Sequence, residues 1–140
     1  MQDLNIFIHQ HWQLSSLFAL LLVLTFIVEF IRLRWGAARL NPTQITNLIN
    51  HQNALVLDLR PAASFASGHI IGSMSIPAEE FKDKAKKIEK MKTRPIILVC
   101  AKGLESPKIA TTLKNQGFHV HILGGGINSW TNADLPLVKE

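Results

Sequence analysis

The chain contains one cysteine, few charged residues and, in its first 31 positions, no lysine or arginine. A single cysteine excludes an internal disulfide framework and a zinc site built from several thiolates. Charged residues make up 18% of the chain, against about a quarter in an average globular protein, and the apolar excess lies near the N-terminus. The length of 140 residues suits one domain and excludes a second full domain.

Positive charge is confined to the part of the chain from Arg32 onward. All fifteen Lys and Arg and eight of the ten acidic residues lie from Arg32 onward, so this part carries a formal charge of +7. Such a surplus suits nucleic acid, anionic lipid or a small anion equally well. Charge alone therefore leaves the class of partner open.

A long apolar run near the N-terminus predicts a membrane-spanning helix. Between Leu14 and Ile31 the only charge is Glu29, and no glycine or proline interrupts the run. Trp12 and Trp35 bracket it at a spacing of 23 residues. This spacing is roughly 35 Å along a helix and matches the distance between the two interfacial belts of a bilayer. We expect a transmembrane helix over residues 14–34.

Two other interpretations of this run are less well supported. A cleaved signal peptide carries basic residues before the apolar stretch, whereas here they follow it. A buried helix that is apolar on every side needs a larger surrounding core than about 100 residues supply. Because Arg32, Arg34 and Arg39 follow the run, the positive-inside rule places the C-terminal part in the cytoplasm, where Cys100 stays reduced.

After residue 36 short apolar bursts alternate with turn signals, and this change of pattern divides the chain. We assign residues 1–13 to a short N-terminal segment, 14–34 to the membrane helix, 35–40 to a linker and 41–140 to a folded domain. Strands are expected at residues 54–57, 96–99 and 120–123, with an extended segment at 70–76. Helices are expected after Asn41, over 79–91 and 107–116, and around Trp130. This alternation indicates an α/β fold, with a mostly parallel sheet flanked by helices on both faces.

Cys100 directly follows the expected strand 96–99, at the carboxyl end where ligands bind in such sheets. Ser106 and Pro107 are typical of the start of a helix, whose dipole and free N–H groups favour a thiolate. Lys102 adds a cation that should lower the thiol pKa, and Gly103 permits a tight turn with its amides inward. A small buried core residue is the other interpretation, and the spacing alone does not separate the two.

Several motifs, in order, resemble the single-domain rhodanese family over residues 41–140. The family's Asp-x-Arg is matched by Asp58-Leu59-Arg60, and its Phe-x-x-Gly-His-Ile-x-Gly-Ala-x-x-Ile-Pro stretch by residues 65–77, with Ser73 in place of the common alanine. Its C-terminal pattern is matched by Gly117-Phe118, Gly124-Gly125-Gly126-Ile127, Trp130 and Leu135-Pro136. A membrane helix before one such domain resembles a subgroup of bacterial anchored rhodaneses, which implies a single-pass protein of the inner membrane.

The resemblance implies a rhodanese-type sulfurtransferase in which Cys100 is the nucleophile and carries a persulfide. Its thiolate would take the sulfane sulfur of a donor, and a thiol acceptor or cyanide would then remove it. The loop amides would hold the sulfur anion, so the expected substrate-binding residues are Ala101, Lys102, Gly103, Leu104, Glu105 and Ser106. Asp58, Arg60 and His69 are expected to support the fold around the site, and no metal or cofactor is implied.

One residue of the loop departs from the family pattern. Active family loops commonly read Cys-x-x-Gly-x-Arg-Ser, whereas Glu105 stands here in place of the arginine. This change argues against efficient use of an anionic donor such as thiosulfate. Related phosphatases have arginine six residues after the cysteine, where this chain has Ser106, so the bidentate group that holds phosphate is missing. The alternative function is a catalytically weak rhodanese-like interaction module that recruits a protein partner to the membrane.

The remaining motifs are expected to have structural or surface roles and not to bind metal, nucleotide or nucleic acid. His119 and His121 share one face of a strand, but two imidazoles with no third ligand more often form a solvated strand edge than a metal site. Residues 124–126, three glycines, lack the spacing of a nucleotide fingerprint and are expected to form a tight turn near the Cys100 loop. The basic run 82–94 is a solvated helix face or a contact with anionic headgroups. It does not indicate nucleic acid, because no aromatic residues separate its lysines.

Overall fold

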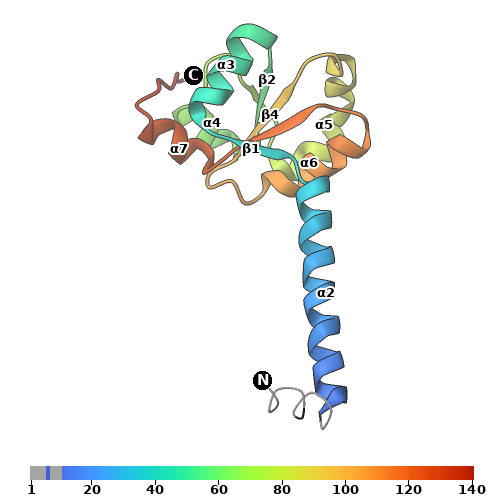
Figure 1. The fold of residues 1–140 in the computed structure, drawn as a ribbon. Helices are drawn as coiled ribbons and strands as arrows, with labels where there is room; N and C mark the ends of the chain where they lie inside the picture. The colour runs from blue at the N-terminus through green and yellow to red at the C-terminus, as the bar shows by residue number, and fades with distance from the viewer. Residues whose placement is uncertain (1–5, 7–10) are drawn as a thin grey trace. The chain divides into compact units, whose positions relative to one another are not determined.

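The computed structural model describes residue 6 and residues 11–140, together with their side chains outside residues 32–35. The chain divides into two compact units, residues 1–35 and 36–140. Helix α2 (Trp12–Trp35) makes up nearly all of the described part of the first unit, and the second contains the strands and the helices α3 to α7 (Figure 1).

Helix α2 has no described side chain buried within the apolar stretch Trp12–Ile31, and this stretch of 20 residues is long and apolar enough to cross a membrane. Leucine, valine and phenylalanine side chains are therefore exposed on all sides of the helix, in contrast to a core helix. The expected bounds 14–34 fall inside α2. The side chains of Arg32, Arg34 and Trp35 lie outside the described residues, so the roles expected of them stay predictions.

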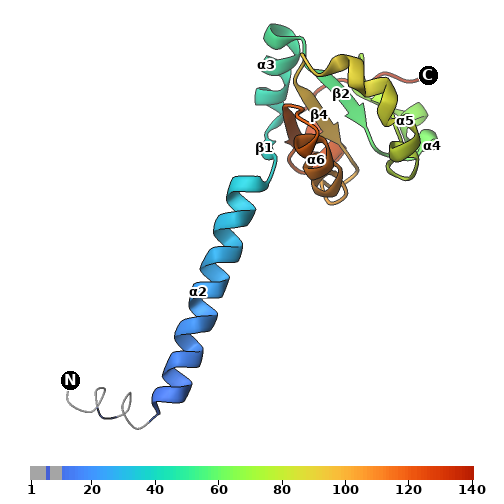
Figure 2. The ribbon, with the colours of Figure 1, turned by 90° about the vertical axis from the view of Figure 1, so that its right-hand side faces the viewer.

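The second unit is built on a five-stranded sheet in which all four strand pairings are parallel. The strand order is β1-β5-β4-β2-β3, so β4 is the central strand, and β2 lies beside it (Figure 2). The strands are β1 (Ala38–Leu40), β2 (Leu55–Asp58), β3 (Met74–Ser75), β4 (Ile96–Val99) and β5 (Val120–Leu123). The expected α/β fold is confirmed, although the extended segment 70–76 contributes only the two residues of β3.

Helices cover both faces of the sheet, and side-chain alternation along the strands explains why. In β2, Leu55 and Leu57 belong to one hydrophobic cluster and Val56 to the other. The first cluster is completed by α5 (Phe81–Ile88) and α6 (Ser106–Asn115), the second by α3 (Pro42–Gln52) and α7 (Gly126–Asn132). The helical elements that remain are α4 (Ala62–Ser67), η1 (Ala78–Glu80) and η2 (Glu89–Met91). Each fully buried Leu or Ile contributes about 1.5–3 kcal/mol, so both faces stabilise the sheet.

Strand β1 lies in the segment that the sequence assigns to a linker. Residues 38–40 pair in parallel with β5, in the register Ala38 with His121 and Leu40 with Leu123. This edge strand is three residues long and only half-buried at its last position, so it has no apolar alternation that a sequence pattern could show. Only Gly36 and Ala37 therefore separate the end of α2 from the sheet.

The turn after β5 packs directly on the residue after β4. The Ile127 N–H donates to the Cys100 carbonyl over 2.9 Å, and Gly126 adopts φ +63° beside it. A Cβ added at Gly126 would lie 2.1 Å from the Cys100 carbonyl oxygen. The expectation that residues 124–126 form a tight turn near the Cys100 loop is confirmed, and the close approach requires glycine.

We expect Gly126→Ala to destabilise the chain far more than Gly117→Ala. Gly117 also has a positive φ, of +89°, but a Cβ there meets nothing within 4 Å. Backbone strain alone costs about 1–2 kcal/mol, whereas Gly126→Ala adds a clash with backbone and should cost at least about 2 kcal/mol more. Denaturant unfolding of both full-length variants in detergent measures this, and equal losses would contradict the packing described.

Candidate active site

Cys100 is the first residue after β4, a strand whose four residues are all buried. The cysteine is 1% exposed, and the Ser106 hydroxyl donates a hydrogen bond to its sulfur over 3.2 Å. Ser106 is the first residue of α6 and is itself fully buried. The loop 101–105 thus leaves the sheet and returns to the cysteine, so the sulfur faces the N-terminus of a helix.

The environment favours the thiolate of Cys100. Burial raises the pKa of the thiol, but hydrogen bonds to the sulfur outweigh burial, so the pKa lies below its ordinary value. The donors are the Ser106 hydroxyl and the backbone N–H groups of Ser106, Glu105 and Gly103. Lys102, expected to supply a helpful cation, is exposed and is not one of the groups that lower this pKa.

Ser106 has a different role from the one its position predicts. The sequence suggests a helix cap, but α6 begins at Ser106 itself, and Glu105 occupies the capping position without a side-chain hydrogen bond. The Ser106 hydroxyl is directed at the sulfur instead. Spacing gives no signal for this contact, because only the closure of the loop brings positions 100 and 106 together.

The six expected substrate-binding residues divide into two groups. Gly103, Glu105 and Ser106 donate to the sulfur, and Gly103 adopts φ +78°, which turns the loop back toward the sheet. The other three, Ala101, Lys102 and Leu104, are exposed on the outside of the loop, and Leu104 is 74% exposed. The loop therefore surrounds the sulfur with backbone N–H groups and presents these three side chains to solvent.

Asp58 and Arg60 form a buried ion pair beside this edge of the sheet. The Arg60 guanidinium donates to both Asp58 carboxylate oxygens, over 2.6–3.1 Å, and to the Gly68 carbonyl over 2.7 Å. The Arg60 N–H also donates to Asp58. A bidentate pair that holds a neighbouring loop fits the supporting role expected of both residues.

His69 lies next to this pair and has structural contacts of its own. Its ring stacks on Phe65 with centroids 3.8 Å apart, and its Nδ1 lies 2.9 Å from the Phe65 carbonyl oxygen. Its backbone pairs with Val138. The expectation that His69 is a hydrogen-bonded structural residue is confirmed.

Glu105 faces a pocket of about 260 Å³ that adjoins the Cys100 loop. Two more carboxylates, Glu79 and Glu80, line the same pocket. The remaining lining residues are uncharged: Leu59, Pro61, Ala62, Pro77 and Ala78. The residue that replaces the family's arginine therefore belongs to an acidic surface, which a doubly charged anion meets as repulsion.

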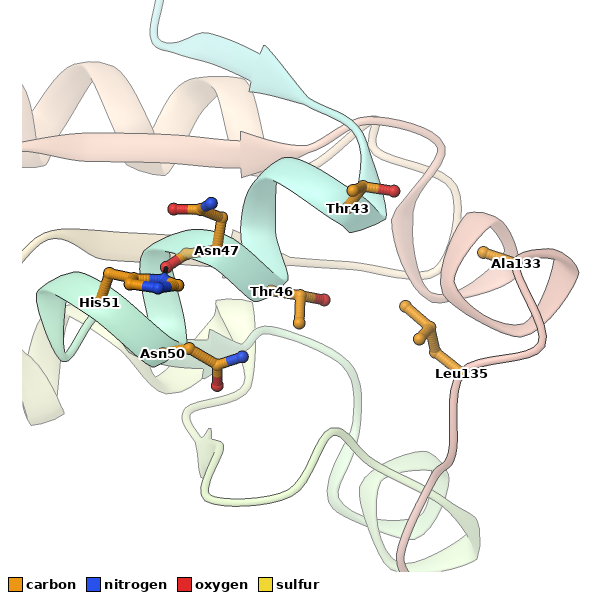
Figure 3. A pocket seen from close by; sticks show the side chains of 7 residues that line it. All are labelled: Thr43, Thr46, Asn47, Asn50, His51, Ala133 and Leu135. Atoms are coloured by element: carbon orange, nitrogen blue, oxygen red, sulfur yellow. Dashed lines mark hydrogen bonds between the residues drawn. The ribbon is translucent and has the colours of Figure 1, made fainter.

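Elsewhere on the same unit lies a groove of about 330 Å³ between α3 and the segment after α7 (Figure 3). Thr43, Thr46, Asn47, Asn50 and His51 form its α3 wall, and Ala133 and Leu135 form the other wall (Figure 3). None of these residues belongs to the Cys100 loop. Among the described residues no group of three or more His, Cys, Asp or Glu is placed to hold a metal ion.

Comparison with known proteins agrees with this geometry. The uncharacterized protein YibN of Escherichia coli K12 is 33% identical to the chain over 99% of both proteins. The thiosulfate sulfurtransferase GlpE of Pseudoalteromonas translucida is 32% identical and matches 64% of this chain and 85% of that protein. A crystal structure of a rhodanese-related protein from Thermoplasma volcanium is 28% identical, with a TM-score of 0.67 over 74% of this chain and 99% of that one.

The family model that matches describes the domain directly. It is that of the rhodanese-like domain, and it covers residues 41–133. The matched range contains β2 to β5, the Cys100 loop, the Asp58–Arg60 pair and the turn that packs on Cys100. The chain belongs to the rhodanese-like domain family.

Proposed function

We propose that this protein is a membrane-anchored sulfurtransferase that carries sulfane sulfur as a persulfide on Cys100. The observation that carries the proposal is the set of donors around one sulfur atom: a hydroxyl and three backbone N–H groups. These donors keep the thiolate available as a nucleophile near neutral pH. The relatives named thiosulfate sulfurtransferase support the same class of reaction.

The reaction has two displacement steps. In the first, the Cys100 thiolate attacks the terminal sulfane sulfur of a donor; a sulfur–sulfur bond forms to Cys100, and the bond to the rest of the donor breaks and leaves its electron pair there. In the second, an acceptor thiolate attacks that outer sulfur and leaves as a persulfide, while Cys100 is released as a thiolate. No net oxidation or reduction occurs, and the same loop donors stabilise the sulfur anion before and after transfer.

The acidic pocket beside the loop limits which donor fits. Glu105 and Glu79 present negative charge where an anionic donor would approach, whereas Glu80, in the same wall, is paired with Lys84. We infer that the donor is a persulfide carried by a protein or by a small thiol with no further negative charge, and that doubly charged thiosulfate is a poor donor.

Anchoring follows from α2 and its flanks. The proposed protein crosses the bacterial inner membrane once, through the stretch Trp12–Ile31. Because Arg32, Arg34 and Arg39 follow this stretch, residues 36–140 lie in the cytoplasm. A reducing compartment keeps the lone thiol free to react. Donor and acceptor then meet the site at the membrane surface.

The second candidate function is an interaction module that recruits a protein partner. Glu105 favours it, because it replaces the arginine expected in active loops, and so does Leu104, a large apolar side chain exposed on the same loop. The module needs no reactive thiol. The reactivity of the Cys100 thiol therefore distinguishes the two functions.

We predict that Cys100→Ser abolishes sulfur transfer from a polysulfide to a thiol and leaves the fold intact. A serine hydroxyl fits the same buried space but is not ionised at neutral pH, so the first displacement is lost. Transfer rates and thermal unfolding of the full chain in detergent check both parts. Undiminished transfer by a well-folded Cys100→Ser variant would refute the assignment.

Removing the Ser106 hydroxyl should weaken the nucleophile without unfolding the chain. In Ser106→Ala the thiolate loses a donor, so the pKa of Cys100 rises and its alkylation profile moves to higher pH. At neutral pH alkylation should be about two- to tenfold slower, the factor that one net hydrogen bond contributes. Thr112→Ala, which removes an exposed hydroxyl from the same helix, serves as the control. A profile unchanged from wild type in Ser106→Ala would exclude the contact from thiolate stabilisation.

Reversing the charge at position 105 should restore use of thiosulfate. Glu105→Arg replaces repulsion by attraction at the mouth of the loop, so the thiosulfate:cyanide activity should rise about tenfold or more, chiefly through the Michaelis constant. A persulfide of a thiol with no further negative charge should gain little. Glu89→Arg makes the same charge change on an exposed residue outside the pocket and should have no such effect. Equal thiosulfate kinetics for wild type and Glu105→Arg at low ionic strength would show that the pocket charge is irrelevant to the donor.

A further inference from the structure

A third pocket, of about 270 Å³, lies at the start of β5, where that strand meets β1. Its polar walls are Lys114 of α6, His119 and His121, and the remaining lining residues are Gly36, Ala38, Phe118 and Val120. Drug-sized ligands occupy pockets of about 300–1,000 Å³, so this space suits a smaller polar group. Neither the reaction at Cys100 nor the loop around it uses these residues.

The charge around this pocket is of one sign. Lys114 and the two histidines converge on it, and the Lys92 ammonium lies 5.3 Å from the ring centroid of Phe118 in its wall. None of the described residues that line it is acidic. Neither Lys92 nor Lys114 forms an ion pair with another described residue. Lys114 thus lies beside two imidazoles in a wall that contains no carboxylate among the described residues.

His121 has a polar atom in this region whose hydrogen bonding is unsatisfied. Its Nδ1 is buried and has no hydrogen-bond partner among the described residues. Burial together with the charges of His119 and Lys114 lowers the pKa of its imidazole, so the protonated ring is disfavoured there. An anion would relieve the repulsion and give the ring an acceptor after a small rotation.

The position of the pocket along the chain indicates where such an anion would come from. Gly36, in its wall, directly follows the last residue of α2, and its carbonyl accepts a hydrogen bond from Lys114 over 3.0 Å. The apolar stretch of α2 ends at Ile31, and the five residues from there to Gly36 extend about 7 Å in a helix. If α2 spans the bilayer, the wall of the pocket lies at the depth of the lipid headgroups.

We propose that the pocket formed by Lys114, His119 and His121 binds the phosphate group of an anionic lipid headgroup. The proposal rests on the membrane anchoring proposed above but not on the sulfur chemistry. Lysine and imidazole N–H groups are suited to phosphate oxygens, and the orphaned His121 nitrogen provides a donor that has no other use. Bound lipid would fix the folded unit to the membrane surface at its point of attachment.

Histidine ring NMR of the full-length chain in zwitterionic detergent tests this directly. Three probes are titrated separately: dioctanoyl phosphatidylglycerol, dioctanoyl phosphatidylcholine and inorganic phosphate. We expect saturable shifts of the His119 and His121 ring signals with phosphatidylglycerol and none for His51 on α3. Lys114→Gln should weaken the apparent affinity about fivefold, as expected for one basic residue near a headgroup, whereas Lys86→Gln on α5 should not.

The probes separate the possible sources of the anion. Saturation by phosphatidylglycerol supports a headgroup site, whether or not free phosphate also saturates the shifts. Saturation by free phosphate but not by phosphatidylglycerol overturns the lipid assignment. Equal shifts with phosphatidylcholine, parallel shifts of His51, or an unchanged affinity in both Lys114→Gln and His119→Gln overturn the site. Alkaline extraction of membranes tests the anchor separately: a chain that stays in the membrane fraction but shows no histidine shifts loses the headgroup site alone.

Discussion

A sulfur anion inside a protein requires hydrogen-bond donors, and the folded unit is arranged around supplying them to Cys100. The donors come from a five-residue loop that turns through Gly103 and ends at the buried Ser106. The loop holds this shape because the strand before it is buried on both faces and Gly126 packs against the Cys100 carbonyl. The Asp58–Arg60 pair fixes the neighbouring loop through Gly68. The hydrogen bonds from Ser106, Glu105 and Gly103 lower the pKa of the Cys100 thiol, and the other contacts hold the surrounding backbone in place.

Parallel topology places the two proposed binding sites at opposite edges of one sheet. The chain enters the folded unit at Ala38, at the amino edge, where Lys114, His119 and His121 form the basic pocket. The Cys100 loop and the acidic pocket of Glu105 lie at the carboxyl edge. A phosphate group bound at the first edge therefore leaves the Cys100 loop at the other edge open to donors and acceptors.

The sequence predicts this fold well where burial is continuous and poorly where contacts depend on loop closure. Strands 96–99 and 120–123 coincide with β4 and β5, because fully buried strands produce uninterrupted apolar runs. β1 is three residues at an exposed edge and leaves no such pattern. The Ser106–sulfur contact and the pocket around Lys114 both join residues from different elements, so they emerge only when the sheet is assembled. Glu105 is predicted as a departure from the family, but the two carboxylates beside it are not.

The central claim is that Cys100 carries sulfur, and intact-mass and peptide mass spectrometry test it most directly. The full-length chain is purified in detergent, incubated with a polysulfide and freed of excess donor. We expect an added mass of one sulfur on the peptide that contains Cys100, and its removal when a thiol acceptor is added. A folded chain that acquires no such sulfur under these conditions would contradict the account and leave the interaction module as its function.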